Sequence, residues 1–220
     1  MSVTTPKALL LDLGNVTVRL RGPEWLERLG AACSPAKTPR QLMEGLLDHG
    51  GPHHRYERGQ IDGPAFHAEF QRRLGLTLGY GDWRALWNDY FEPNRPMEAL
   101  VARLRGQLRF WALSNTNAEH LAHLKLNFRV FDTFEGITAS NEAGAAKPEP
   151  SIYQAAIQGL GLEPGEILYL DDIPAYIDAG RAAGLQAFHY TFNDHELRQH
   201  LLELGLQLPP LAGNSATMAC

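Results

Sequence analysis

Predicted strands and helices alternate along the second half of this 220-residue chain. The strand patterns, which are short apolar runs, span residues 108–113, 134–138, 167–170 and 186–189. The helix patterns around them span residues 100–104, 118–126, 151–160, 174–183 and 194–204. Strands that alternate with helices of this length favour a doubly wound parallel sheet, so the sequence predicts an α/β, Rossmann-like fold.

The N-terminus supplies one more strand of this sheet. The apolar run Leu9-Leu10-Leu11 predicts a buried strand that ends on Asp12, and Gly14-Asn15 is a turn signal. Open α/β sheets bind ligands at the carboxyl ends of their strands, which is where Asp12 would lie. A buried carboxylate costs free energy unless it binds a cation, accepts hydrogen bonds or reacts. A lone Asp at this point can also simply cap the next helix.

Residues 17–93 interrupt the alternation. They contain no predicted strand, and their helical patterns span residues 23–32, 38–47, 64–74 and 82–91. Ordinary connections in α/β units are a few residues plus one helix, so we expect an inserted all-helical cap over the carboxyl edge of the sheet. The expected organisation is a Rossmann-like core of residues 1–16 and 94–207, a helical cap of residues 17–93 and a flexible tail of residues 208–220.

An aromatic stripe runs along the last helical pattern of the cap. Trp83, Trp87 and Phe91 recur at i, i+4 and i+8, which places them on one face of a helix. Such a stripe is more often the core of its own module than a ligand site. We therefore assign these side chains to the core of the cap.

The composition narrows the classes of partner. The formal net charge of −5 gives no reason to expect nucleic acid or an anionic membrane as partner. No apolar stretch has the length of a membrane span, and the N-terminus lacks the apolar segment of a signal peptide. Cys33 and Cys220 lie far apart without metal-ligand spacing, which is typical of reduced thiols. We expect a cytoplasmic protein, a monomer or a homodimer, that acts on a small molecule.

Polar side chains follow three further predicted strands. Ser114-Asn115 stands at a turn into a helix and is suited to holding an anion or to capping that helix. Lys147 precedes a proline, which keeps the lysine in extended backbone. Asp171-Asp172 are adjacent acids that repel each other unless a cation lies between them and Asp12. The parallel topology predicts that all these side chains meet at one edge of the sheet.

This joint pattern resembles the haloacid dehalogenase-like hydrolase superfamily, in which most members are magnesium-dependent phosphatases. The four motifs, in chain order, are Asp12, Ser114-Asn115, Lys147-Pro148 and Asp171-Asp172. The resemblance covers nearly the whole chain, including a helical cap inserted after the first motif. Within the superfamily the chain resembles the branch whose first motif reads D-L-G-N-V, which also shows Glu57-Arg58-Gly59 in the cap and K-P-E before I-Y. Members of that branch are similar to sugar-phosphate phosphatases.

The resemblance implies a role for each residue. Asp12 is the nucleophile that forms an aspartyl-phosphate, and Lys147 offsets the charge of the phosphate and the acids. Ser114 and the Asn115 amide bind phosphate oxygens, and Glu57 of the cap binds substrate. The implied ligands of Mg²⁺ are Asp12, the backbone carbonyl of Gly14, Asp171 and Asp172. The implied function is Mg²⁺-dependent hydrolysis of a small phosphorylated metabolite, similar to a sugar phosphate.

Gly14 departs from the pattern of the family. Most phosphatases of the family carry a second Asp here, which acts as general acid for the leaving group and as base for water. General acid–base catalysis is typically worth ~10²–10⁴-fold in rate. We expect slow turnover, a leaving group that needs little protonation, or a substitute from the cap, for which the candidates are Glu57, His53 and His54.

Two other features carry expectations about the site. Tyr176 stands where many relatives have Asn, which predicts a looser orientation of Asp172. The run from Asp48-His49 to His53-His54 contains Gly-Gly-Pro, so we interpret it as a loop whose side chains meet solvent or substrate rather than zinc. Substrate specificity is expected in the cap loops around residues 50–60.

Three other functions are compatible with parts of the pattern. A non-catalytic module that only binds a phosphorylated ligand would explain Gly14. A metal-independent 2-haloacid dehalogenase would also use Asp12 as nucleophile and lack the second Asp, but it has no need for the paired acids at 171–172. A phosphoacceptor signalling domain fits less well, because its paired acids precede the acceptor and it has no inserted cap.

Overall fold

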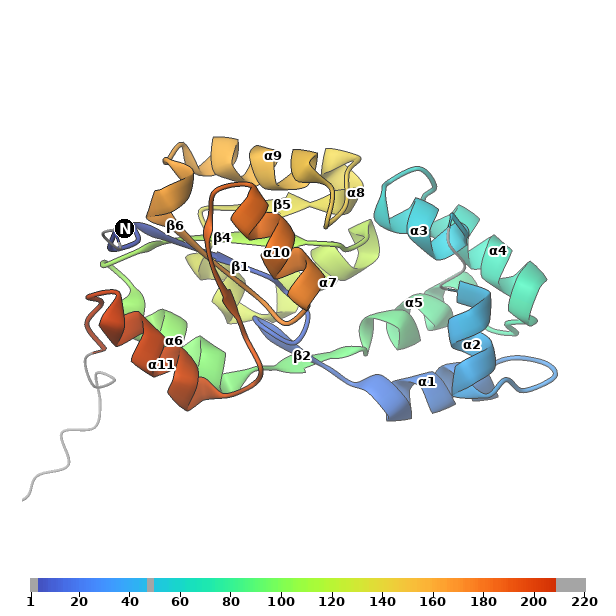
Figure 1. The fold of residues 1–220 in the computed structure, drawn as a ribbon. Coiled ribbons are helices and arrows are strands. Elements are labelled where there is room, and N and C mark those ends of the chain that lie inside the picture. Colours follow the sequence, from blue (N-terminus) through green and yellow to red (C-terminus); the bar gives the residue numbers. More distant parts are fainter. Residues whose placement is uncertain (1–3, 47–49, 209–220) are drawn as a thin grey trace, which may run out of the picture.

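The computed structural model describes residues 4–46 and 50–208, with a parallel sheet of five strands in the order β5-β4-β1-β6-β7 (Figure 1). The strands are β1 (Ala8–Leu11), β4 (Arg109–Ser114), β5 (Gly136–Ala139), β6 (Ile167–Asp171) and β7 (Gln186–His189). The chain starts in the middle strand, adds β4 and β5 on one side, and adds β6 and β7 on the other. The predicted doubly wound α/β fold is confirmed. Both boundaries of each predicted strand lie within two residues of those of the observed strand.

Helices connect these strands and cover the sheet. They are α6 (Arg95–Leu104), α7 (Ala118–Asn127), α8 (Ser140–Ala143), α9 (Pro150–Leu160), α10 (Pro174–Ala182) and α11 (Asp194–Glu203), with the short 3-10 turns η1 (Arg129–Thr133) and η2 (Pro164–Glu166). Pro150 and Pro174 open their helices because proline lacks an N–H that would otherwise go unpaired in the first turn.

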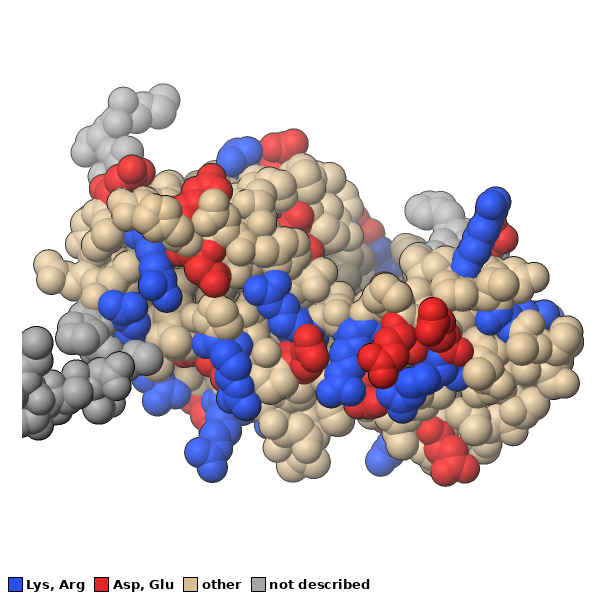
Figure 2. Space-filling view, turned by 90° about the horizontal axis from the view of Figure 1, so that it is seen from below, with Lys and Arg blue, Asp and Glu red and all other residues tan. Residues whose placement is uncertain are grey.

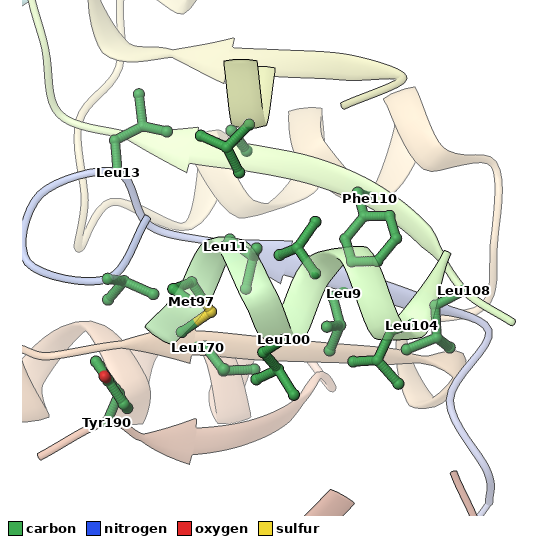
Figure 3. Close-up of a cluster of buried hydrophobic side chains, with 14 of the residues drawn as sticks. Leu9, Leu11, Leu13, Met97, Leu100, Leu104, Leu108, Phe110, Leu170 and Tyr190 are labelled. Atoms are coloured by element: carbon green, nitrogen blue, oxygen red, sulfur yellow. The ribbon is translucent and has the colours of Figure 1, made fainter. Parts of the chain in front are cut away.

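Alternate residues of β1 enter two separate hydrophobic cores, because successive side chains of a strand point to opposite faces. Leu9 and Leu11 belong to the core on one face, together with apolar residues of α6, α7 and α11. Ala8 and Leu10 belong to the core on the other face, with residues of α9 and α10. Figure 3 shows the first core, in which Leu100 of α6 lies among the strand residues. Both faces of the sheet are therefore buried, as the continuous apolar run of β1 predicts.

The remaining helices lie together at one end of the sheet (Figure 1). They are α1 (Gly22–Ala31), α2 (Pro39–Leu46), α3 (Pro52–Glu57), α4 (Gly63–Leu74) and α5 (Tyr80–Asn88). They share a hydrophobic core of their own, whose largest buried side chains include Phe66, Trp83 and Trp87. We refer to these five helices as the cap.

The prediction that residues 17–93 contain no strand is wrong. The chain enters the cap through β2 (Val18–Leu20) and leaves it through β3 (Phe91–Pro93), and these two strands pair antiparallel. The helix predicted over 82–91 therefore stops early: α5 ends at Asn88, and Phe91 packs in the core of the sheet rather than in that of the cap. Strand β3 pairs with a segment some 70 residues away, and this pairing overrides the local helical pattern. The local pattern alone therefore did not reveal the strand.

The loop predicted around Gly-Gly-Pro is confirmed at Gly50 and Gly51 but is wrong from Pro52 onward. Pro52 is the first residue of α3, so His53 and His54 lie on a helix. Asp48 and His49 lie outside the described residues, as do residue 47 of the predicted second helix and residues 209–220 of the predicted tail.

Short polar contacts join α3 to the part of the molecule that holds the sheet. The guanidinium of Arg58 makes two hydrogen bonds to the Glu149 carboxylate and a third, at 3.1 Å, to the Gly144 carbonyl. The Ser140 hydroxyl lies 2.5 Å from the Glu57 carbonyl. Gly59 has a φ of 66°, and a Cβ there would lie 2.1 Å from the Asn141 carbonyl oxygen, so only glycine fits. The Glu57-Arg58-Gly59 motif is thus where the cap meets the rest of the chain.

Charged side chains of both signs intermix on the face seen in Figure 2. Ion pairs such as Arg28–Asp89 and Arg72–Glu69 lie on the cap surface. Among the described residues, no helix combines the length and the apolar character needed to cross a bilayer.

Replacing Leu9 with alanine tests the packing between sheet and helices. Leu9 is 0% exposed, so we expect Leu9→Ala to lower the free energy of unfolding by about 2–5 kcal/mol in urea denaturation. Leu126 on α7 is 84% exposed, and Leu126→Ala should change that free energy by no more than about 0.5 kcal/mol. Equal losses in the two variants would contradict the assigned core.

Candidate active site

Four chain segments bring polar side chains to the carboxyl edge of the sheet. Asp12 directly follows β1, and its backbone N–H donates to the Leu170 carbonyl of β6 at 3.0 Å, so sheet pairing fixes its position. Ser114 is the last residue of β4, and Asp171 is the last residue of β6. Lys147 arrives from the segment between α8 and α9. Residues far apart in the chain meet here because parallel strands end at the same edge.

Lys147 binds two of the acids directly. Its Nζ donates to Asp12 Oδ1 at 2.6 Å and to Asp171 Oδ2 at 2.6 Å. The side chains of Lys147 and Asp171 are 1% and 0% exposed, so these ion pairs are screened very little by solvent. The Tyr169 hydroxyl also donates to Asp171 Oδ2, and the Ile173 N–H donates to Asp171 Oδ1 at 2.8 Å. Hydrogen bonds from Tyr169 and Ile173 therefore fix the Asp171 carboxylate, and Asp171 in turn holds the Lys147 ammonium.

The site carries more negative than positive charge. Burial raises the pKa of the Asp12 carboxyl above its ordinary value, Lys147 opposes that rise, and the Asp171 carboxylate adds to it. Burial by itself lowers the pKa of Lys147, but the Asp12 and Asp171 carboxylates more than offset this and raise it above its ordinary value. The lysine is therefore charged, and one ammonium faces three acids.

The third acid is Asp172, and a residue of the first motif orients it. Carboxylate oxygens of Asp12, Asp171 and Asp172 lie within 4.8 Å of one another. Asn15 has a φ of 58°, a left-handed conformation that Asn tolerates better than most residues, and its Nδ2 donates to Asp172 Oδ2 at 3.1 Å. In the sequence, Asn15 stood out as part of a turn signal and of the D-L-G-N-V motif, and no contact with Asp172 was predicted for it.

This donor set suits a hard divalent cation. Three carboxylates and one ammonium leave a net charge of two negative units if all are ionised, in a place where water screens little. Carboxylate oxygens are the ligands that Mg²⁺ prefers, and a divalent cation would balance the charge. Asp12 Oδ1, Asp172 Oδ2 and both oxygens of Asp171 already accept hydrogen bonds, so Asp12 Oδ2 and Asp172 Oδ1 are the least engaged oxygens.

Asn115 supports the lysine rather than pointing its side chain at an anion. Its Oδ1 accepts from the Lys147 backbone N–H at 2.7 Å, and its Nδ2 donates to the Lys147 carbonyl at 3.0 Å. Both ends of the side-chain amide are thus committed to one residue. Of the groups predicted to hold phosphate, the Ser114 hydroxyl makes only a weak 3.4 Å contact, to the Asn115 carbonyl, and is 4% exposed.

Tyr176 also acts on the lysine. Its ring lies 4.9 Å from Lys147 Nζ, within the range of a cation–π contact, and its hydroxyl accepts from Asn115 Nδ2 at 3.3 Å. The expected loosening of Asp172 has no support in these contacts, since Asn15 holds that carboxylate. The sequence did not reveal the link to Lys147, because it depends on where α10 begins relative to α9.

A pocket of about 250 Å³ adjoins the acidic cluster, between the edge of the sheet and the cap. Its lining on the side of the sheet includes Ser114, Asn115, and Leu13 and Gly14, the two residues that follow Asp12 in the chain. The lining residues do not include Asp12, Lys147, Asp171 or Asp172 themselves. A larger depression of about 550 Å³, bordered by Arg95 and Arg129, lies at the surface and is lined by none of the predicted site residues.

His53 and Glu57 of α3 line the same pocket as Gly14. They are one helical turn apart, with His53 Nδ1 3.6 Å from Glu57 Oε2. Their side chains are 19% and 25% exposed. His54 is not among the residues that line the pocket. Of the three candidates for the missing acid–base group, two are therefore next to the site.

Comparison with known proteins shows which family the chain matches. The profile of the haloacid dehalogenase-like hydrolases matches residues 7–184. Phosphatase MT3486 of Mycobacterium tuberculosis is 32% identical over 108 residues, which are 49% of this chain and 48% of that protein. The chain thus matches about half the length of this curated relative.

Two other relatives match over most of their length. The sesquiterpene phosphatase astK of Aspergillus oryzae is 24% identical over 86% of this chain and 91% of that protein. The D-ribitol-5-phosphate phosphatase of Bacteroides thetaiotaomicron is 24% identical over 89% of this chain and 96% of that protein. A solved haloacid dehalogenase family enzyme from the same bacterium, in complex with magnesium and inorganic phosphate, is 27% identical, with a TM-score of 0.71 over 84% of this chain and 93% of that one.

Proposed function

The chain belongs to the haloacid dehalogenase-like hydrolase family, and we propose that it is a phosphatase that hydrolyses a small phosphorylated metabolite with the help of Mg²⁺. The observation that carries the proposal is the contact of Lys147 with Asp12 and Asp171, beside a third acid. Three converging carboxylates favour this function over a metal-independent dehalogenase, which has no need for them. Three relatives are named as phosphatases, which also supports the proposed phosphatase function.

The residues proposed to hold Mg²⁺ are Asp12, Asp172, the carbonyl of Gly14 and Asp171, the last directly or through a water molecule. A bound cation supplies the positive charge that lets a carboxylate approach a phosphate dianion. The metal- and phosphate-bound structure of the Bacteroides relative supports the same cation for this chain.

Metal binding can be tested without measuring turnover. We expect Mg²⁺ to raise the Tm of the metal-free wild-type protein, because a cation relieves repulsion among the three acids. Asp172→Asn should lose most of this rise, whereas Asp132→Asn, which alters an exposed acid on η1, should keep it. An equal rise in all three proteins, measured by differential scanning fluorimetry, would contradict the proposed ligands.

Asp12 is proposed as the nucleophile. Lys147 holds Oδ1, so Oδ2 is the oxygen left to attack phosphorus. As the Asp12–phosphorus bond forms, the bond to the alcohol oxygen breaks, and its electron pair stays with that oxygen. A water molecule then attacks the aspartyl-phosphate, which releases inorganic phosphate and restores the carboxylate. The Lys147 ammonium and the Ser114 hydroxyl offset the charge on the phosphoryl oxygens during both steps.

Replacing the nucleophile should abolish the reaction. An amide at position 12 cannot form the aspartyl-phosphate, so we expect Asp12→Asn to lower kcat/KM for 4-nitrophenyl phosphate at least about 10³-fold in the presence of Mg²⁺. Asp132→Asn is the matched control and should retain activity. Undiminished hydrolysis by the Asp12 variant would show that another group attacks. Absence of turnover by the wild type, combined with tight binding of phosphorylated ligands, would favour the non-catalytic alternative.

His53 is the proposed proton donor, in place of the Asp that most phosphatases of the family carry at the position of Gly14. It lines the same pocket as Gly14, and the Glu57 carboxylate 3.6 Å from its Nδ1 would orient the ring. In this role His53 gives a proton to the departing alcohol oxygen and later takes one from the attacking water. Glu57, which was predicted to bind substrate, would then act through His53.

The leaving group discriminates this role from a structural one. An alkoxide needs a proton as it leaves, whereas 4-nitrophenolate does not. We therefore expect His53→Gln to lower kcat about 10²-fold or more for an alkyl phosphate but less than tenfold for 4-nitrophenyl phosphate. His54→Gln should leave both rates unchanged. Equal losses on the two substrates would contradict proton donation by His53.

The comparisons leave the alcohol part of the substrate undecided. The resemblance implies a sugar phosphate, and the name of the ribitol-phosphate relative agrees with a polyol. The sesquiterpene phosphatase is named for an apolar alcohol, and it is equally identical to this chain. Names alone therefore do not choose between the two, and the choice has to come from the pocket.

A further inference from the structure

Apart from His53 and Glu57, the side chains that line the pocket between Gly14 and the cap helices are apolar or aromatic. Leu20 borders Gly14, since a Cβ at position 14 would lie 3.3 Å from Leu20 Cδ1. Trp25, Leu26 and Tyr90 continue the wall outward, and the Trp25 and Tyr90 rings lie 4.5 Å apart between centroids. Carbon surfaces therefore surround most of the space that an alcohol would fill.

Several polar groups of the wall already have partners. The Trp25 indole N–H donates to the Leu86 carbonyl at 2.8 Å. His120 lies 3.0 Å from Asn117 Nδ2 through Nδ1 and 3.1 Å from the Trp87 carbonyl through Nε2, so both ring nitrogens are engaged. Burial lowers the pKa of His120 to about 3, so its ring is neutral. These two residues therefore present rings, not hydrogen-bonding atoms, to an occupant.

Few groups remain for the hydroxyls of a sugar. They are His53 and Glu57, which stand together, the Tyr90 hydroxyl near them, and Thr116 on the side of the sheet. A hexose or pentitol phosphate brings several hydroxyls into the pocket, and each one buried without a hydrogen-bond partner weakens binding. The chain of an apolar alcohol has no further hydroxyls to leave unpaired, and burial of its carbon surface favours binding.

On the basis of the phosphatase function proposed above, we infer that the substrate is the phosphate monoester of an apolar alcohol rather than of a polyol. The phosphate would lie at the inner end, toward Ser114, and the hydrocarbon would extend along Leu20 toward Trp25 and Tyr90. The cap wall thus selects the substrate, and the edge of the sheet performs the chemistry.

The size of the pocket limits the alcohol. A cavity of about 150 Å³ lined by apolar side chains accepts benzene. The 250 Å³ here therefore suit a phosphate together with one ring or a chain of comparable length. This differs from the sugar phosphate that the sequence resemblance implies.

A matched pair of substrates tests the inference. n-Hexyl phosphate and D-glucitol 6-phosphate are both phosphates of primary six-carbon alcohols, so their leaving groups differ mainly in polarity. We expect kcat/KM of the wild-type protein with Mg²⁺ to be at least about tenfold higher for n-hexyl phosphate. In the series from ethyl to hexyl phosphate, each added methylene should raise kcat/KM about threefold to fourfold until the pocket is full.

A variant of the wall ties the preference to this pocket. Leu20→Asn should lower the ratio of the two kcat/KM values about tenfold or more, because it replaces apolar wall with an amide. Leu126→Asn makes the same chemical change at an exposed position of α7 and should leave the ratio unchanged. Equal ratios in the wild type and both variants would overturn the assignment of the wall.

The outcomes separate the inference from the function on which it rests. Asp12-dependent hydrolysis of 4-nitrophenyl phosphate, with n-hexyl phosphate handled no better than D-glucitol 6-phosphate, would overturn the inference and leave the phosphatase intact. No hydrolysis of any of these esters by the wild-type protein with Mg²⁺ would overturn the phosphatase function, and the inference with it.

Discussion

The buried ammonium of Lys147 between Asp12 and Asp171 is the interaction on which the site depends. It holds Asp12, the proposed nucleophile, in place and keeps two carboxylates close together in a region that water screens poorly. The sheet makes this possible, because β1 and β6 are neighbours and deliver the two acids to the same edge. Three residues then hold the lysine in place. Tyr169 binds its partner Asp171, the Tyr176 ring lies against its ammonium, and Asn115 binds its backbone.

One short segment connects this chemistry to the cap. Lys147 reaches the acids, and two residues later Glu149 receives Arg58 from the end of α3. The same helix carries His53 and Glu57 into the pocket, and the Ser140 hydroxyl meets its last carbonyl. The position of α3, and with it the shape of the pocket, is therefore set by contacts with the segments that flank Lys147.

Sequence patterns predicted the elements whose signals are local. The apolar runs of the five strands and the proline-initiated helices α9 and α10 lie within two residues of their predicted ends. Predictions failed where a partner distant in sequence decides the structure. Phe91 fits a helical stripe, but pairing with β2 places it in a strand. Trp87 belongs to the cap core as predicted, yet it also borders the pocket, a dual position that helical periodicity does not reveal.

By itself the sequence determined the order of strands and helices in the Rossmann-like part of the chain and the residue types at the ends of those strands. Apolar periodicity and turn residues act over a few positions, and parallel strands must end at a common edge. Tertiary structure alone decided which atoms those residues touch, that Asn15 orients Asp172, and that the cap presents mainly apolar side chains to the pocket. Those contacts join residues that are distant along the chain, such as Asn15 with Asp172 and Arg58 with Glu149, so they exist only in the folded protein.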